Sequence, residues 1–143
     1  MRKIVVVSDS FKGSLPSKQI CEIVEQEVKA FFPDCEVVGI PVADGGEGTV
    51  DCFLASLPGE KVSVEAKGPY FEPVQAFYGR IGETAIIEMA AAAGLPLVAD
   101  RKNPLLTTTY GVGELMRHAL EQGVKRLILA LGGSATNDGA CGA

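Results

Sequence analysis

The sequence contains a single histidine and no long hydrophobic run. None of its apolar stretches approaches the ~20 residues of a membrane-spanning helix, so we predict no membrane partner. Only four apolar residues, Ile4–Val7, follow the basic start of the chain, whereas the apolar core of a secretory signal has about seven to fifteen. We therefore predict a cytoplasmic protein. The histidine, His118, has no second metal ligand nearby, and we interpret it as a surface or packing residue in a helix.

The chain also lacks an excess of positive charge and any cysteine pairing pattern. It has 13 Lys and Arg against 18 Asp and Glu, with a net charge of −5. A protein that binds nucleic acid needs a basic face, so we predict no nucleic-acid partner. The four cysteines show neither a CxxC pair nor zinc-finger spacing, and we interpret them as reduced thiols. Cys21 and Cys52 are expected to pack as small hydrophobic residues.

The chain does have enough apolar material for a core, and many glycines. Hydrophobic residues form 47% of the 143, and the mean hydropathy is +0.22. These values exclude a disordered chain and allow one domain with a real core. The 17 glycines indicate many tight loops. Residues 141–143 directly follow a glycine-rich loop that would normally lead into a helix, so we expect a truncated piece of a longer protein, inactive by itself.

The first part of the sequence has the pattern of an α/β protein. β-Branched and apolar runs predict strands at 4–7 and 35–42. Between them, apolar residues at three- and four-residue spacing predict a helix over 16–32, with Ser14 as its N-cap. Strand, helix and strand with short connections form a βαβ unit, so the two strands should be parallel. A short helix capped by Thr49 is expected next.

The pattern changes in the middle of the chain and then returns. Three strands without helices between them are predicted at 61–66, 73–78 and 84–89. In the first of them Val62, Val64 and Ala66 alternate with polar or charged residues, which is typical of a sheet with one solvated face. A helix over 111–122 and a strand over 125–131 restore the α/β pattern. The middle stretch is therefore interpreted as a separate antiparallel layer or an inserted subdomain.

Three loops rich in small residues follow predicted strands, at residues 8–14, 43–49 and 132–139. The first two run straight into predicted helices. In an open parallel α/β sheet, ligands collect outside the carboxyl ends of the strands. Free backbone amides and the positive end of a helix dipole attract phosphate there. The three loops together predict one polar site that handles phosphate.

Charged residues in the first two loops each have two interpretations. Lys12 can neutralise a phosphate or a substrate carboxylate, or it can be solvated while Asp9 and Ser10 bind loop amides. Asp44 and Glu47 lie in a loop with three glycines and could hold Mg²⁺ together with phosphate oxygens. Alternatively, Asp44 forms a turn and Glu47 favours the dipole of the next helix. Three glycines are more than a turn needs, which favours a function for this loop.

The third loop, residues 132–139, could cradle phosphate with its backbone amides. It is neither a Walker A loop nor a G-x-S-x-G elbow. Thr107 and Thr108 add donors before a helix, with a capping segment as the alternative for this stretch. Glu88 lies late in an apolar strand, and a buried carboxylate needs a partner. We expect a lysine or backbone amides as its partner, although it could line the site.

Five segments match one family in its order across essentially the whole chain. They are DSFKGS (9–14), PVADGGEGT (41–49), IEMAA (87–91), NPLLTTTYG (103–111) and GGSATNDG (132–139). Together they resemble the glycerate kinase type 1 family. The resemblance implies ATP-dependent phosphorylation of D-glycerate to a phosphoglycerate with Mg²⁺, so glycerate and a nucleotide would be the small-molecule partners.

The resemblance also implies an α/β fold with two domains, one of them flavodoxin-like with a Rossmann-like parallel sheet, and the chain passing between them. The second α/β domain would contain the antiparallel strands. Family members are more than twice as long as this chain, so we expect a fragment of a two-domain protein. The expected segments are 1–60 (flavodoxin-like), 61–106 (inserted and β-rich, from the second domain) and 107–143 (α/β, ending in a glycine-rich loop).

The residues expected to act follow from this chemistry. Lys12 would meet the charge of a substrate carboxylate or phosphate, and Asp44 and Glu47 would serve Mg²⁺ or the substrate hydroxyls. A rival interpretation is a non-catalytic regulatory protein that binds a phosphometabolite on the same scaffold. The sequence leaves open the catalytic base, the glycerate hydroxyl that reacts, the nucleotide preference and the oligomeric state. The expected substrate- and phosphate-binding residues are Asp9, Ser10, Gly45, Gly46, Thr107, Thr108, Gly132, Gly133, Ser134, Thr136, Asn137 and Asp138.

Overall fold

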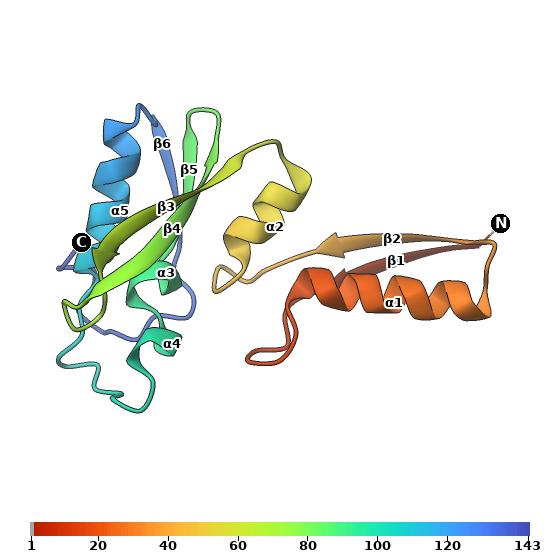
Figure 1. Cartoon of the computed structure of the whole chain (residues 1–143), viewed down its shortest axis with the longest axis horizontal. Helices are drawn as coiled ribbons and strands as arrows, with labels where there is room; N and C mark the ends of the chain where they lie inside the picture. Colours follow the sequence, from red (N-terminus) through yellow and green to blue (C-terminus); the bar gives the residue numbers. More distant parts are fainter. Residues whose placement is uncertain (1) are drawn as a thin grey trace. The chain divides into compact units, whose positions relative to one another are not determined.

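The structure, a computed structural model, describes residues 2–143 and divides into two compact units. The first unit extends to Asp44, and the second begins at Gly45. The first contains β1 (Arg2–Ser8), α1 (Ser17–Phe31) and β2 (Cys35–Pro41). The second contains α2 (Thr49–Ser56), β3 (Glu60–Lys67), β4 (Pro73–Ile81), β5 (Thr84–Glu88), α3 (Ala90–Ala93), α4 (Leu95–Val98), α5 (Tyr110–Glu121) and β6 (Arg126–Ala130) (Figure 1).

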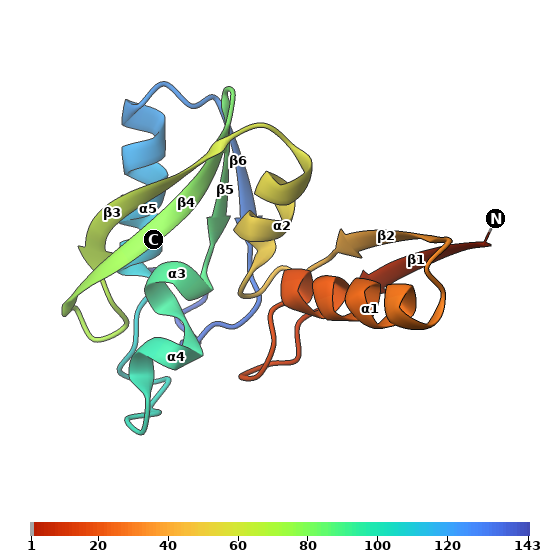
Figure 2. The same cartoon turned by 45° about the vertical axis from the view of Figure 1, so that its right-hand side comes forward.

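The first unit is a parallel strand pair with one helix. β1 and β2 pair in parallel, with Ile4 opposite Val37. α1 lies along this pair (Figure 2). A Cβ on Gly39 of β2 would come within 2.8 Å of the Cβ of the buried Cys21 of α1, so glycine at this position lets the helix approach the strand closely. The predicted βαβ order with parallel strands is confirmed.

The start of α1 differs from the prediction that Ser14 is its N-cap. The cap position is held by Pro16, which is extended at φ −70° and ψ 150°. The carbonyl of Phe11 accepts the amides of Ser14 at 2.8 Å and Leu15 at 3.1 Å. These bonds close a turn before the helix, and Ser14 belongs to that turn. Ser17 is the first helical residue, and its hydroxyl forms hydrogen bonds at this end of α1 with the Ser8 carbonyl and the Val42 amide.

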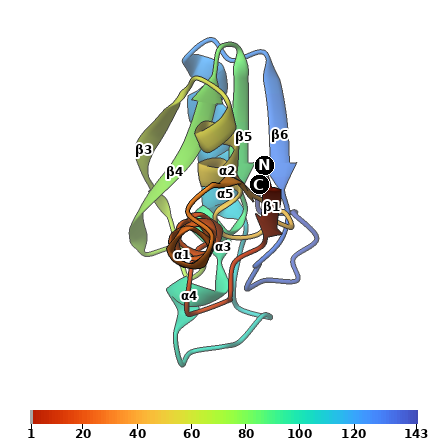
Figure 3. The ribbon, with the colours of Figure 1, turned by 90° about the vertical axis from the view of Figure 1, so that its right-hand side faces the viewer.

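Four strands form the sheet of the second unit, in the order β3-β4-β5-β6 (Figure 3). β4 is antiparallel to both of its neighbours, β3 and β5. β6 pairs with β5 in parallel, and Glu88 at the end of β5 lies opposite Ala130 at the end of β6. The predicted antiparallel layer is confirmed, and the parallel pair beside it makes the sheet mixed.

Helices cover both faces of this sheet, with α5 on one side and α2 on the other (Figures 1 and 3). Ile87 of β5 is buried with Leu115 of α5 in the main hydrophobic core. Side chains alternate between the two faces along a strand, so Ile86 and Glu88 point to the opposite face. Val50 of α2 is fully buried there. Glu88 therefore faces α2 rather than the main core.

The compact units of this chain do not coincide with the segments expected for the whole protein. The expected first segment is 1–60, and the first compact unit of the chain ends at Asp44. The reason is that α2 packs on the sheet of the second unit, where Val50 is buried. We also expected 61–106 and 107–143 to be distinct segments, but β6 joins the sheet of the middle strands through β5. Periodicity predicts a strand without indicating which sheet it will join.

The start of α2 also differs from the prediction that Thr49 is its cap. The cap position is Gly48, whose φ of +88° favours glycine. Thr49 is the first helical residue, and its hydroxyl donates to the carbonyl of Gly46 at 2.8 Å. This bond fixes the turn by which the second glycine-rich loop enters α2.

Two one-turn helices follow β5. α3 is a run of four alanines that Gly94 ends. α4 is not predicted by the sequence, because a helix of four residues has too few positions to show a period. No helix in the described part of the chain is both long and apolar enough to cross a bilayer.

Candidate functional site

In the first unit, two of the predicted loops leave the carboxyl ends of β1 and β2. The buried hydroxyl of Ser17 donates to the carbonyl of Ser8, the last residue of β1. The same hydroxyl accepts the amide of Val42, directly after β2, at 3.1 Å. The Val42 amide also lies 3.3 Å from the Ser8 carbonyl. One buried hydroxyl thus holds together the two strand ends and the start of each loop.

The same two loops are joined by an exposed ion pair. Lys12 Nζ lies 3.4 Å from Asp44 Oδ2, and the two side chains are 80% and 53% exposed. In the first loop, Asp9 Oδ1 accepts the amide of Ser10 at 2.7 Å. The Asp9 carboxylate therefore orders its own loop. The ammonium and the carboxylate of the ion pair remain open to solvent, where a ligand can reach them.

In the second unit, the loop that carries Glu47 lies against the start of the third loop. The amide of Gly132 donates to the carbonyl of Gly45 at 2.8 Å. A Cβ on Gly132 would lie 2.6 Å from the amide nitrogen of Gly46, closer than Cβ atoms come in proteins. A Cβ on Gly133 would lie 3.9 Å from Glu47 Oε1. Glycines thus allow the two loops to touch, and the contact places the Glu47 carboxylate beside the third loop.

A buried carboxylate lies at the start of α2. Glu88 is only 2% exposed, and its Oε1 accepts the amide of Val50 at 2.6 Å. Burial raises the pKa of Glu88, and hydrogen bonds from the backbone amides of Val50 and Gly48 oppose that rise without cancelling it. The prediction that backbone amides bind Glu88 is confirmed.

Thr107 and Thr108 lie beside the third loop. The Thr107 hydroxyl donates to the carbonyl of Ala135 at 2.8 Å, and the Thr107 carbonyl accepts the hydroxyl of Thr136 at 2.8 Å. The hydroxyl of Thr108 lies 3.4 Å from Asp138 Oδ2. The polar residues predicted in these two segments therefore come together. Several of their hydroxyls bind the neighbouring segment and hold the third loop in place.

The remaining predicted residues of the third loop are Ser134 and Asn137. The Ser134 hydroxyl lies 3.3 Å from both the carbonyl and the amide of Thr136, which stabilises the bend of the loop. Asn137 is exposed. The third loop thus combines a fixed backbone with an exposed amide side chain at its tip.

Asp138 fixes the start of α5. Its Oδ2 accepts the amide of Thr109 at 2.8 Å and the hydroxyl of Thr109 at 2.9 Å, and its Oδ1 accepts the amide of Ala140 at 3.1 Å. Partial burial acts to raise the pKa of Asp138, but the hydrogen bonds from Thr109, Ala140 and Gly142 outweigh it and lower the pKa. The structure engages the Asp138 carboxylate with protein donors, and its predicted contact with a ligand stays a prediction.

Asp138→Asn is expected to destabilise the chain by about 1 kcal/mol at neutral pH, the usual cost of losing a cap bond. A carboxyl group with a lowered folded pKa stabilises the fold above its unfolded pKa, and that stabilisation is lost as the pH falls through the folded pKa. The ordinary pKa of an aspartate carboxyl group is 3.8. The difference in melting temperature between parent and variant should therefore be present at pH 7 and shrink below about pH 4. Asp100→Asn, at an exposed carboxylate, is the control, and a difference that persists unchanged at low pH would contradict the assignment.

A cation bound by these loops would need a ligand to supply part of its coordination shell. In the described residues, no group of three or more His, Cys, Asp or Glu side chains gathers around one point. Mg²⁺ needs only one or two protein carboxylates when phosphate oxygens and water complete its shell. Asp44 in the first unit and Glu47 in the second are each exposed, and each offers a carboxylate of the kind that such a partly hydrated ion accepts.

Sequence reasoning missed two polar contacts. Ser17 gave no signal, because one serine in the first turn of a helix is common. His118, predicted to be a surface or packing residue, lies with its Nδ1 3.2 Å from the hydroxyl of Tyr78. Tyr78 is fully buried, and burial raises its pKa, with the nearby Arg80 guanidinium opposing the rise. His118 was predicted to be a surface or packing residue, and it is half-buried, with its ring centroid 5.8 Å from that of Tyr78.

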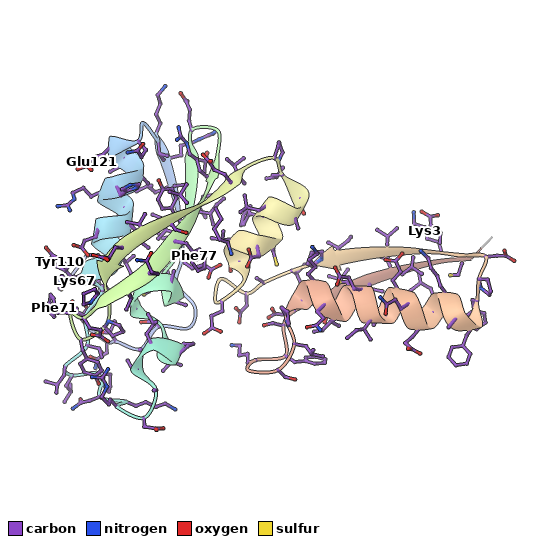
Figure 4. All side chains as sticks on the ribbon, viewed as in Figure 1. Lys3, Lys67, Phe71, Phe77, Tyr110 and Glu121 are labelled. Carbon is purple, nitrogen blue, oxygen red and sulfur yellow. The ribbon has the colours of Figure 1, made fainter. Side chains whose placement is uncertain are left out.

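An aromatic pair stabilises the turn between β3 and β4. Phe71 has a φ of +64°, which costs a residue with a side chain about 1–2 kcal/mol. Its ring centroid lies 5.5 Å from that of Tyr110 (Figure 4), a contact worth about 0.5–1.5 kcal/mol. The two values are of the same order, so the ring contact can offset the strain. No predicted site residue belongs to this pair.

Comparison with known proteins gives the family of the chain. The model of the glycerate kinase family matches residues 4–143. The chain belongs to the glycerate kinase family. It is 52% identical to a glycerate kinase of Bacillus cereus (strain ATCC 10987 / NRS 248) and 47% identical to the glycerate 2-kinase of Escherichia coli (strain K12), each over 98% of this chain.

A solved structure agrees with this family assignment. The crystal structure of a proposed glycerate kinase 2 from Salmonella typhimurium LT2 superimposes with a TM-score of 0.79 at 46% identity, over 99% of this chain and 38% of that one. The chain likewise spans 38% of the length of the Bacillus cereus and Escherichia coli proteins. The α/β fold expected from the resemblance is confirmed for this part of such a protein.

Proposed function

We propose that the protein carrying this chain is a glycerate kinase, which transfers the γ-phosphoryl group of ATP to a hydroxyl of D-glycerate. The observation that carries the proposal is the identity of about 50% to glycerate kinases along essentially the whole chain. The site is consistent with this chemistry, because amides, hydroxyls, an ammonium and carboxylates lie in loops at strand ends. The requirement for ATP and Mg²⁺ and the cytoplasmic location stay predictions.

The residues of this chain would act by position and charge. In phosphoryl transfer the substrate oxygen attacks the γ-phosphorus, the bond to the β-phosphate oxygen breaks, and the protein mainly aligns the groups and meets their charge. Lys12 would bind the glycerate carboxylate or a phosphate. Bound Mg²⁺ would neutralise phosphate charge, with Asp44 and Glu47 as its protein ligands. Backbone amides of the third loop, held by Thr107 and Asp138, would bind phosphate oxygens.

The product distinguishes the finer alternatives. The Escherichia coli relative is a glycerate 2-kinase, so we propose the 2-hydroxyl of glycerate as the acceptor. The test incubates the full-length protein carrying this segment with ATP, Mg²⁺ and D-glycerate, and identifies the product by ³¹P and ¹³C NMR. 2-Phosphoglycerate supports the proposal in full. Binding of glycerate without formation of ADP would favour the rival, a regulatory protein that binds phosphometabolites.

Asp44→Asn in the full-length protein is expected to lower kcat/KM for glycerate at least about tenfold, or roughly 1.4 kcal/mol of transition-state stabilisation. The melting temperature should change little, because the ion pair of Asp44 with Lys12 is exposed and such pairs contribute little to stability. Asp34→Asn, at an exposed carboxylate of the same unit, should leave kcat/KM unchanged. Equal activity of Asp44→Asn and the parent protein would assign Asp44 a structural role only.

A further inference from the structure

Glu88 is buried where a charge is costly, and no step of the proposed reaction uses it. The side chain is 2% exposed and belongs to the last residue of β5. Burying a carboxylate is unfavourable unless hydrogen bonds or a cation compensate it. An isosteric apolar residue would fill the same space without that cost. The presence of a carboxylate at this point therefore calls for a reason beyond packing.

The hydrogen bonds of the Glu88 carboxylate lead to the loop that carries Glu47. Its Oε1 accepts the Val50 amide at 2.6 Å, and the Gly48 amide also donates to its carboxylate. These amides belong to the first turn of α2 and to its cap. They flank Thr49, whose hydroxyl binds the Gly46 carbonyl. The Glu88 carboxylate thus holds the C-terminal end of this loop, and the hydrogen bond from the Gly132 amide to the Gly45 carbonyl holds its N-terminal end.

Glu88 is also tied to the strand that leads into the third loop. It lies opposite Ala130, the last residue of β6, and the amide of Met89 donates to the Ala130 carbonyl at 2.9 Å. Gly132 and Gly133 follow directly, and a Cβ on Gly133 would lie 3.2 Å from the Cβ of Ala90. The segment that begins at Glu88 therefore contacts both loops that meet at the site in the second unit.

We infer that Glu88 is a positioning residue, which sets the place of the Glu47 carboxylate by holding the amides of Gly48 and Val50 against the end of β5. In this role it would act through the loop and not by its own contact with substrate or nucleotide. The inference rests on the proposed function for its kinetic consequence, and on the hydrogen bonds of this chain for its structural part. A loop displacement of about 1 Å can lower a rate by about a hundredfold, so a residue of this kind affects kcat without binding the substrate.

The test compares Glu88→Ala and Glu88→Gln in the full-length protein with Glu114→Ala as the matched control. Glu114 also uses a carboxylate oxygen to accept a backbone amide, that of Lys67 at 2.7 Å, but it holds β3 rather than the Glu47 loop. Glu88→Gln keeps a carbonyl oxygen that can accept the amide of Val50. The readouts are kcat and KM per folded molecule and the hydrogen exchange of the Gly48 and Val50 amides by NMR.

Glu88→Ala should lower kcat at least about tenfold with a smaller change in KM, and should speed exchange of the two amides, whereas Glu88→Gln should keep kcat within about threefold of the parent protein. Glu114→Ala should leave kcat unchanged even where it lowers the melting temperature. Unchanged kcat and unchanged amide exchange in folded Glu88→Ala would overturn the inference. So would a Gln variant as slow as Ala, since the charge itself would then be required.

The two proposals fail in distinguishable ways. A full-length parent protein that forms no phosphoglycerate would overturn the proposed function. The exchange of the Gly48 and Val50 amides would still report whether Glu88 holds the loop. If the parent protein is active and only the Glu88 comparison gives the wrong outcome, the positioning role alone is wrong.

Discussion

Gly111→Ala is expected to destabilise the chain by about 3 kcal/mol, the upper part of the usual range for a side chain forced into a filled space. Glycine in a helix is ordinarily less stable than alanine by about 1 kcal/mol, so a simple propensity argument predicts the opposite sign. The difference arises because a Cβ on Gly111 of α5 would overlap the backbone carbonyl oxygen of Lys67, with the carbonyl carbon at 2.9 Å. Backbone atoms of a paired strand cannot move away as a flexible side chain could.

Urea unfolding of Gly111→Ala measures this effect, with Arg117→Ala in the same helix as the control. The Arg117 side chain is 70% exposed and forms an ion pair with Glu121, an interaction worth little at the surface. The control should therefore change the free energy of unfolding by less than about 0.5 kcal/mol. A stabilised Gly111→Ala chain would mean that α5 does not lie as close to the end of β3 as the structure has it.

Gly132→Ala should reduce the activity of the full-length protein by about a hundredfold, which corresponds to roughly 2.7 kcal/mol. The added Cβ would lie 2.6 Å from the nitrogen and 2.8 Å from the Cα of Gly46. The loop that carries Glu47 must then move, and the hydrogen bond from the Gly132 amide to Gly45 is strained or lost. This change acts on the geometry of the site while removing no charged or polar group.

Kinetic assays of Gly132→Ala at a temperature well below melting check this expectation. Cys141→Ala is the control, because Cys141 is an exposed residue just beyond the same loop and has no role in the proposed site. It should retain full kcat/KM. Activity of Gly132→Ala close to that of the parent would show that contact between the two glycine loops is not needed for the reaction.

The sequence predicted the elements of the fold better than their grouping. The β1, α1 and β2 elements follow from short apolar runs and helical spacing, and the three middle strands follow from alternation, which are local signals. The placement of α2 on the second sheet and of β6 beside β5 depends on contacts between residues far apart in the chain, as with Glu88 and Val50. The predictions of the helix caps were wrong for a related reason. Ser14 belongs to the turn at Phe11 and not to the start of α1, and the left-handed Gly48 holds the cap position that was assigned to Thr49.

The sequence suggested which residues could form the site, but it did not show the hydrogen bonds that hold them. The proximity of Lys12 and Asp44 follows from loops that leave neighbouring parallel strands, a rule of topology. Sequence could not show that Asp138 is bound by Thr109, because a capping carboxylate can come from a distant loop. Nor could it show the role of Ser17, which holds two strand ends with one hydroxyl. Whether the loops of the two units share one ligand stays a prediction.

The ion pair between Lys12 and Asp44 has a consequence for how an anion would bind. Both groups are largely solvated and 3.4 Å apart, so exchanging one partner for another changes the hydration of each only slightly. If Lys12 binds an anion as proposed, Asp44 would serve as the counterion of the ammonium until a carboxylate or phosphate replaces it. Such an exchange would be sensitive to screening by salt, and the ammonium would already be held near its binding position before the ligand arrives.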